Sequence, residues 1–175
     1  MATRVLLCIG TKKGLFVAES PKTRRRFALR GPFGAGVGVY SALIDTRGTP
    51  RIYGSSCHAY FGMKVLRSTD LGKTFRETKS APAFPKDDGR ALANIWSLDA
   101  GKDKKDLWCG VEPAALFRSR NGGDSWELVP GIINHEHART SLKSPPMNSP
   151  QEQSCLNCAP CAPSITQSRS RSGRR

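Results

Sequence analysis

The sequence predicts an all-β chain in which small antiparallel sheets follow one another, and three observations support this prediction. A turn signature, Ser-x-Asp/Asn-x-Gly-x-Ser/Thr-aromatic, occurs at residues 68–75 and again at 119–126. Apolar segments flank both turns, which is typical of β-hairpins. Similar segments end at Ser20, Ser68 and Ser119, and they recur about every 50 residues, a period typical of propeller blades. The predicted fold class is a partial β-propeller of about three four-stranded blades with a disordered C-terminal tail.

The strands of each blade are predicted from its short apolar stretches. The first blade is expected to hold strands at 5–10, 14–18 and 27–30. The second is expected to hold strands at 39–45, 51–55, 64–68 and 74–79. The third is expected to hold strands at 94–99, 106–111, 115–119 and 125–129. Since the first blade lacks one strand, its edge is expected to be unpaired, which favours self-association through open blade edges.

The residue types of the repeated turn each have a structural reason. The side chain of Asp70 or Asn121 can accept hydrogen bonds from backbone N–H groups of its own turn. A glycine two residues later allows a positive φ without a Cβ clash, and the aromatic residue can seal the base of the turn. The ten residues predicted for this structural role are Ser68, Asp70, Gly72, Thr74, Phe75, Ser119, Asn121, Gly123, Ser125 and Trp126.

The periodicity stops near residue 134, which divides the chain into residues 1–134 and a tail at 135–175. Residues 140–175 are rich in Ser, Pro, Arg, Gln and Asn and contain no aromatic residue. Such a composition buries too little apolar surface to offset the entropy of ordering, so disorder is predicted. Because the change follows a well-formed third blade, we expect that the propeller was truncated there by a shifted or replaced reading frame.

Composition excludes several classes of protein. The net charge of +14 is spread thinly apart from clusters at 24–26 and 102–105, and neither cluster is interleaved with exposed aromatic residues. The charge therefore indicates a solvated basic surface rather than a nucleic-acid interface. No apolar run is long enough for a membrane span, and no secretory signal is evident. A cytoplasmic setting with free thiols is expected. No cofactor or metal site is predicted, because Cys155, Cys158 and Cys161 lack a fourth ligand at the required spacing.

Three segments resemble a bacterial family of WD40/YVTN/BNR-like repeat propellers, whose members are often labelled exo-alpha-sialidase or glycosyl hydrolase. They are Gly10-Thr-Lys-Lys-Gly-Leu-Phe16, the block at 61–74, and Val111-Glu-Pro-Ala-Ala-Leu-Phe-Arg-Ser119 with the turn that follows. The repeated turn is similar to the Asp-box of that family, and the resemblance covers residues 4 to about 134. It implies a sialidase-like blade architecture.

The resemblance to sialidases also implies a site with a three-arginine carboxylate clamp, a Tyr–Glu nucleophile pair and an Asp acid. Planar bidentate pairing by arginine suits a sialic-acid carboxylate. This sequence departs from the pattern, because it has no Phe-Arg-Ile-Pro motif and about three blades rather than a whole ring. Arg67 and Arg118 alternate within predicted strands and are expected to face solvent.

Three residues are candidates for a ligand site. Glu112 ends an apolar strand before Pro113, where a carboxylate could face the central channel as acid, base or ligand contact, or could be a solvated loop acid. His58 and Tyr60 lie in a connection of the second blade that could occupy an equivalent position, or could be surface loop residues.

We therefore expect a non-catalytic, sialidase-like BNR propeller whose ancestral role is to bind a ligand or a protein. The main alternative is an exo-alpha-sialidase-like glycoside hydrolase of the same superfamily. A second alternative is association with nucleic acid through the basic tail.

Overall fold

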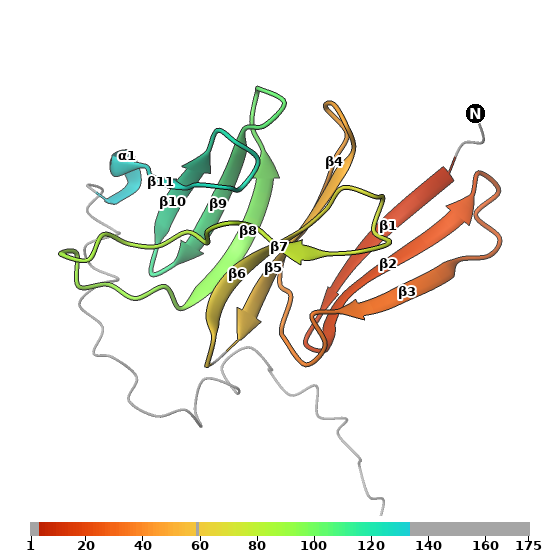
Figure 1. The fold of residues 1–175 in the computed structure, drawn as a ribbon, viewed down its shortest axis with the longest axis horizontal. Helices are drawn as coiled ribbons and strands as arrows, with labels where there is room; N and C mark the ends of the chain where they lie inside the picture. The colour runs from red at the N-terminus through yellow and green to blue at the C-terminus, as the bar shows by residue number, and fades with distance from the viewer. Residues whose placement is uncertain (1–3, 59, 134–175) are drawn as a thin grey trace, which may run out of the picture. The chain divides into compact units, whose positions relative to one another are not determined.

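The computed structural model describes residues 4–58 and 60–133, which form three antiparallel sheets in chain order (Figure 1). The first sheet consists of β1 (Arg4–Thr11), β2 (Gly14–Pro21) and β3 (Ala28–Phe33). The second consists of β4 (Ala42–Asp45), β5 (Arg51–His58), β6 (Gly62–Ser68) and β7 (Arg76–Glu77). The third consists of β8 (Asn94–Ala100), β9 (Leu107–Glu112), β10 (Ala115–Ser119) and β11 (Glu127–Leu128). The short helix α1 (Pro130–Ile133) follows and contacts β10.

Each sheet is an up-and-down meander in which every strand pairs with its neighbour in the sequence. This arrangement confirms the predicted all-β fold class and the three-stranded first blade. The fourth strands are shorter than predicted because the backbone N–H groups of Thr74 and Ser125 bond within their turns instead of joining the sheet. Likewise, β4 begins later than predicted, since the N–H of Val39 donates to the carbonyl of Thr11 in the first sheet.

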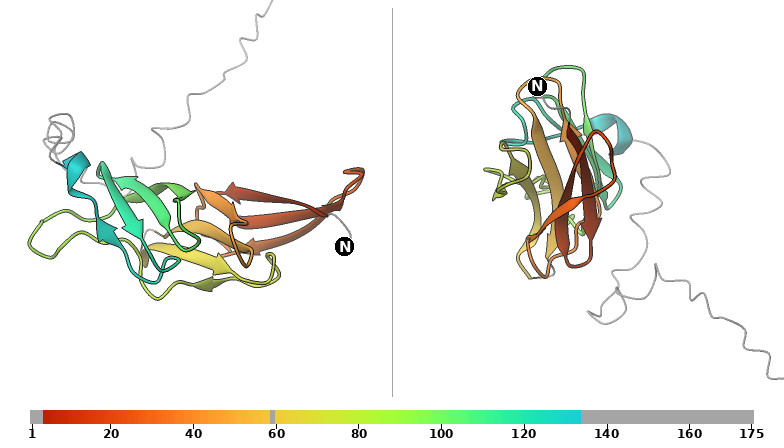
Figure 2. Two further views of the ribbon diagram at one scale, coloured as in Figure 1. Left: turned by 90° about the horizontal axis from the view of Figure 1, so that it is seen from above. Right: turned by 90° about the vertical axis from the view of Figure 1, so that its right-hand side faces the viewer.

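The second sheet lies between the first and the third and buries both of its faces (Figure 2). Side chains alternate across a strand, so successive residues of β5 serve opposite interfaces. Tyr53 belongs to the core shared with the third sheet, together with Val65 and Phe117. Ile52 is also fully buried and, like Val17 of β2, lies against the turn at Gly72 on the side of the first sheet.

Arg47, which follows β4, provides a polar link between the second and third sheets. Its guanidinium pairs with Asp45 and donates to the carbonyl oxygens of Gly101, Asp103 and Asp106. Burial alone would raise the pKa of the Asp45 carboxyl. The hydrogen bond from Arg47 outweighs this effect and holds the pKa below its usual range.

Among the described residues, no helix has the length and apolar character needed to cross a bilayer. The predictions of a disordered tail and of an incomplete cysteine cluster at 155–161 fall outside the described residues.

Candidate binding site

The turn at residues 68–75, here called the second box turn, is organised by two side chains. The hydroxyl of Ser68 accepts the N–H of Gly72 at 2.9 Å and donates to Asp70 at 2.7 Å. Asp70 accepts the N–H groups of Lys73 and Thr74, both at 3.0 Å, and the Thr74 hydroxyl at 2.6 Å. These hydrogen bonds hold the pKa of Asp70 well below its usual range, and the largest contribution comes from the Thr74 hydroxyl. The carboxylate is therefore committed to the turn.

The turn at residues 119–126, the third box turn, repeats this geometry with an amide in place of the carboxylate. The Ser119 hydroxyl accepts the N–H of Gly123 at 2.8 Å. Asn121 accepts the N–H of Ser125 at 2.9 Å through its carbonyl oxygen and donates from its amide to the Ser125 hydroxyl at 2.8 Å. The closing aromatics Phe75 and Trp126 are half-buried, and Phe75 packs against Phe33 of the first sheet with ring centroids 4.6 Å apart. All ten residues predicted for the turns lie in these two motifs.

Both box turns also join one sheet to the next through a cation. Arg30 of β3 donates to the carbonyl oxygen of Leu71 in the second box turn at 3.0 Å. Arg67 of β6 donates to the carbonyl oxygen of Gly122 in the third box turn, also at 3.0 Å. Leu71 and Gly122 occupy the same position, three residues after the box serine. The same joint thus occurs twice in the chain.

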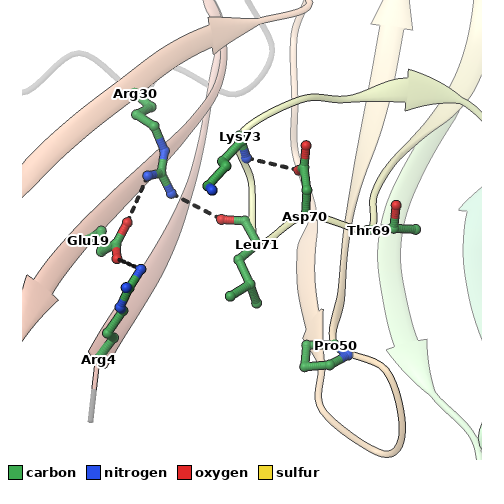
Figure 3. A pocket seen from close by; sticks show the side chains of 8 residues that line it. All are labelled: Arg4, Glu19, Arg30, Pro50, Thr69, Asp70, Leu71 and Lys73. Carbon is green, nitrogen blue, oxygen red and sulfur yellow. Dashed lines mark hydrogen bonds and ion pairs between the residues drawn. The ribbon is translucent and has the colours of Figure 1, made fainter. Parts of the chain in front are cut away.

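A groove of about 380 Å³ lies at the first of these joints (Figure 3). Glu19 stands between Arg4 and Arg30 and pairs with both, at 2.8 and 2.7 Å. Asp70 on the opposite wall is engaged by its own turn. The arginines and Glu19 satisfy one another and Asp70 is engaged by its turn, so these four charged groups serve the joint between the sheets.

The sequence-predicted residue His58 has a structural role at the β5–β6 turn. It ends β5, and its Nδ1 accepts the N–H groups of Tyr60 and Phe61, each at 3.0 Å. An acceptor Nδ1 means that the neutral ring carries its proton on Nε2. The same turn projects Tyr60 and Phe61 outward, with exposed fractions of 86% and 68%.

The sequence-predicted residue Glu112 ends β9 on the neighbouring sheet and accepts the indole N–H of Trp96 at 3.0 Å. Trp96 in turn lies beside Tyr40, with ring centroids 5.3 Å apart. Both aromatic side chains are partly exposed. Sequence reasoning missed Tyr40 and Trp96, and the only available signal was the presence of aromatic residues close to the predicted strand starts.

The two aromatic pairs belong to adjoining ends of the second and third sheets. The Cys57 thiol, next to His58, donates to the Asn94 side-chain oxygen at 2.7 Å, and Asn94 pairs with Glu112 in the sheet. Gly38, shortly before Tyr40, bridges to Cys57. We call this region the aromatic end; its members are Tyr40, His58, Tyr60, Phe61, Trp96 and Glu112.

The prediction that Arg67 and Arg118 face solvent is wrong for Arg67, which lies between the second and third sheets. Arg118 lies on the outer face of the third sheet, and its side chain, like that of Arg67, is half-buried and forms an ion pair. Arg67 pairs with Asp124 at 3.0 Å. Arg118 binds the buried carboxylate of Asp106 through two nitrogens, at 2.7 and 2.8 Å, and this contact lowers the pKa of Asp106. With these partners, the two arginines do not form a carboxylate clamp.

Comparison with protein-family models and with curated proteins finds no match. Among solved structures, the chain is similar to one described as YCF48 bound to D1 peptide, with 13% sequence identity and a TM-score of 0.46. The match covers 73% of this chain and 41% of that one, so the chain spans about two fifths of its length.

Proposed function

We propose that this chain is a non-catalytic binding module that binds an extended polypeptide segment at the aromatic end. The observation that supports this proposal is the presence of four exposed aromatic side chains at adjoining ends of the second and third sheets, Tyr40, Tyr60, Phe61 and Trp96. Large aromatic side chains are enriched at protein interfaces because they bury much area with little loss of side-chain freedom. The net charge of +14 favours rapid encounter with acidic partners.

The polar residues of the same end support binding over catalysis. The lone pair of His58 Nδ1 is occupied by two backbone N–H groups, so this atom is not available as a base. Glu112 holds the Trp96 indole in place. Both polar groups therefore fix the orientation of aromatic neighbours, which is the role expected of polar groups in a binding site. A relation to BNR-repeat proteins is part of this proposal and rests on the geometry of the two box turns.

Panning a random-peptide phage library on the purified full chain tests this function. We expect enrichment of peptides with apolar anchors, and the affinity of a synthetic winner should fall about tenfold or more in Trp96→Ser and in the double variant Tyr60→Ser/Phe61→Ser. Ile132→Ser is the matched control, since Ile132 is an exposed apolar residue on α1. Equal binding by all variants contradicts the proposal. So does hydrolysis of a fluorogenic sialoside that is lost in Glu112→Gln, which would favour the glycoside hydrolase.

A further inference from the structure

The joint between the second and third sheets shows one way in which a sheet holds the box turn of the next. On the second sheet, a row of cross-strand neighbours consists of Leu43, Tyr53, Arg67 and Arg76, and the third box turn contacts its two middle members. Within that row, the Tyr53 hydroxyl and the Arg67 guanidinium both donate to the Gly122 carbonyl, at 3.2 and 3.0 Å. An aromatic donor and an arginine side by side thus form a receptor for the turn.

The outer face of the third sheet carries the same receptor. The equivalent row there is Asp99, Trp108, Arg118 and Glu127. Trp108 replaces Tyr53 as the aromatic N–H or O–H donor, and Arg118 stands in the position of Arg67. The Arg118 guanidinium lies 5.0 Å from the centroid of the Trp108 ring. Within residues 4–58 and 60–133, no box turn contacts this row.

The outer face of the first sheet corresponds to the faces that carry the box turns on the other two sheets. In the second and third sheets, the face that bears the box turn packs on the preceding sheet, and its members Ile52, Leu107 and Cys109 are at most 1% exposed. The corresponding face of the first sheet exposes Leu7 by 46% and Ile9 by 42%. No other described part of the chain covers these apolar side chains, although their counterparts on the other two sheets are buried.

The turn at 20–27, here called the first turn, has the length of a box turn and a positive φ at the same fifth residue. Its backbone differs one residue earlier, since Leu71 and Gly122 have a positive φ and Thr23 does not. Like the other two, it runs from a buried serine to an aromatic residue seven positions later, Phe27. Arg24 adopts a φ of 55° where Gly72 and Gly123 have 77° and 93°. All of its residues after Ser20 are exposed, whereas Gly72, Gly122 and Gly123 are buried in the joints.

The two ends of the Trp108–Arg118 row also carry charges opposite to those of the first turn, while Arg118 between them is paired with Asp106. The first turn bears four cations, Lys22, Arg24, Arg25 and Arg26. The row on the third sheet bears Asp99 and Glu127 at its two ends, and both are exposed. Opposite charges on apposed faces favour encounter and fix the register of a contact.

We propose that a second copy of this chain associates head to tail, with its first turn and the Leu7–Ile9 face on the Trp108–Arg118 row of the first copy. Arg118 and the Trp108 indole then donate to backbone carbonyl oxygens of the first turn, as Arg67 and Tyr53 donate to that of Gly122. Because each copy carries both halves, two copies can complete two such joints and close on themselves. This contact uses faces other than the aromatic end and does not depend on the proposed function.

Sedimentation of the full-length chain over a range of concentrations tests this inference. We expect a species of two or more copies at about 10 μM, corresponding to a micromolar dissociation constant. Two variants attack the two faces at exposed positions, so that folding is kept: Leu7→Lys/Ile9→Lys on one and Asp99→Arg/Glu127→Arg on the other. Each should weaken association by about tenfold or more, because it places charge in an apolar contact or opposes like charges. The control is Asp87→Arg, an exposed charge reversal in the segment between β7 and β8.

Mixing the two variants distinguishes a head-to-tail contact from other pairings. Each variant alone lacks both joints, but a one-to-one mixture retains one intact joint, so association should partly return. A wild-type chain that stays monomeric at about 100 μM overturns the proposal. It is also overturned if only Leu7→Lys/Ile9→Lys disrupts association, because the first sheets would then pair with each other. If the Trp108–Arg118 row instead binds a different β-sheet protein, the purified wild-type chain should stay monomeric, which would also contradict the proposal.

Discussion

The guanidinium of Arg67 lies 3.0 Å from the carbonyl oxygen of Gly122, and the same arginine pairs with Asp124 of the same turn. One side chain of the second sheet thus holds the turn that closes the third. Truncating it in Arg67→Ala leaves a half-buried carboxylate and a buried carbonyl without this donor. We expect the free energy of unfolding to fall by about 2 kcal/mol, measured by urea denaturation. Arg76→Ala, at the exposed neighbour in the same row, is the control, and an equal loss there would contradict the role given to Arg67.

Asp70 should make stability depend on pH in the acid range. Its pKa lies below the ordinary value of 3.8 in the folded chain because its turn donates hydrogen bonds to the carboxylate. A depressed folded pKa contributes stability that is present above pH 3.8 and is lost as the pH falls toward the folded pKa. Asp70→Asn, which copies Asn121 of the third box turn, should therefore flatten the decline in melting temperature below that pH. If its profile matches that of wild type, with Asp87→Asn as the control, the proposed coupling is absent.

Arg24 occupies a backbone conformation that suits glycine. Its φ of 55° lies in the left-handed region, which costs a residue with a Cβ about 1–2 kcal/mol. Replacing it with glycine relieves that cost but adds freedom to the unfolded chain, worth about 0.4–1 kcal/mol. We expect Arg24→Gly to raise the melting temperature by a few degrees, a gain of about 0.5–1 kcal/mol. Arg25→Gly next to it should lower the melting temperature, and a gain in both variants would show that charge removal is the cause.

Alanine substitutions at Gly72 and Gly62 distinguish the cost of backbone strain from the cost of steric crowding. Both have a positive φ, 77° and 75°, so alanine is strained at either position by about 1–2 kcal/mol. A Cβ at Gly72 would lie 2.8 Å from a methyl of Val17, whereas a Cβ at Gly62 has open space around it. Gly72→Ala should therefore cost about 1–3 kcal/mol more than Gly62→Ala in chemical denaturation. Equal costs would mean that the joint with the first sheet adapts without strain.

The sequence predicts those parts of this fold that depend on residues near one another in the chain. The serine, the Asp or Asn and the glycine of each box turn satisfy one another within eight residues, so their pattern indicates the hairpins directly. The first turn lacks the Asp or Asn and the glycine, yet it keeps the same length and a positive φ at Arg24.

Contacts between sheets are what the sequence does not predict. Nothing in the local pattern shows that Arg47 reaches three carbonyls of the third sheet, or that Arg30 on β3 does for the first joint what Arg67 on β6 does for the second. The alternation of a strand tells which residues share a face, but not whether that face meets solvent or another sheet. For this reason Arg67 was predicted to face solvent, and Tyr40 and Trp96 were not predicted as part of the aromatic end.

The position of the second sheet between its two neighbours has a consequence for how the chain opens. Contacts between sheets join the first to the second and the second to the third, so cooperativity passes from neighbour to neighbour, as in linear repeat arrays. The terminal sheets can then unfold locally while the centre stays intact. In hydrogen–deuterium exchange, amides of β5 and β6 should be the last to acquire deuterium, and those of β1 should exchange early.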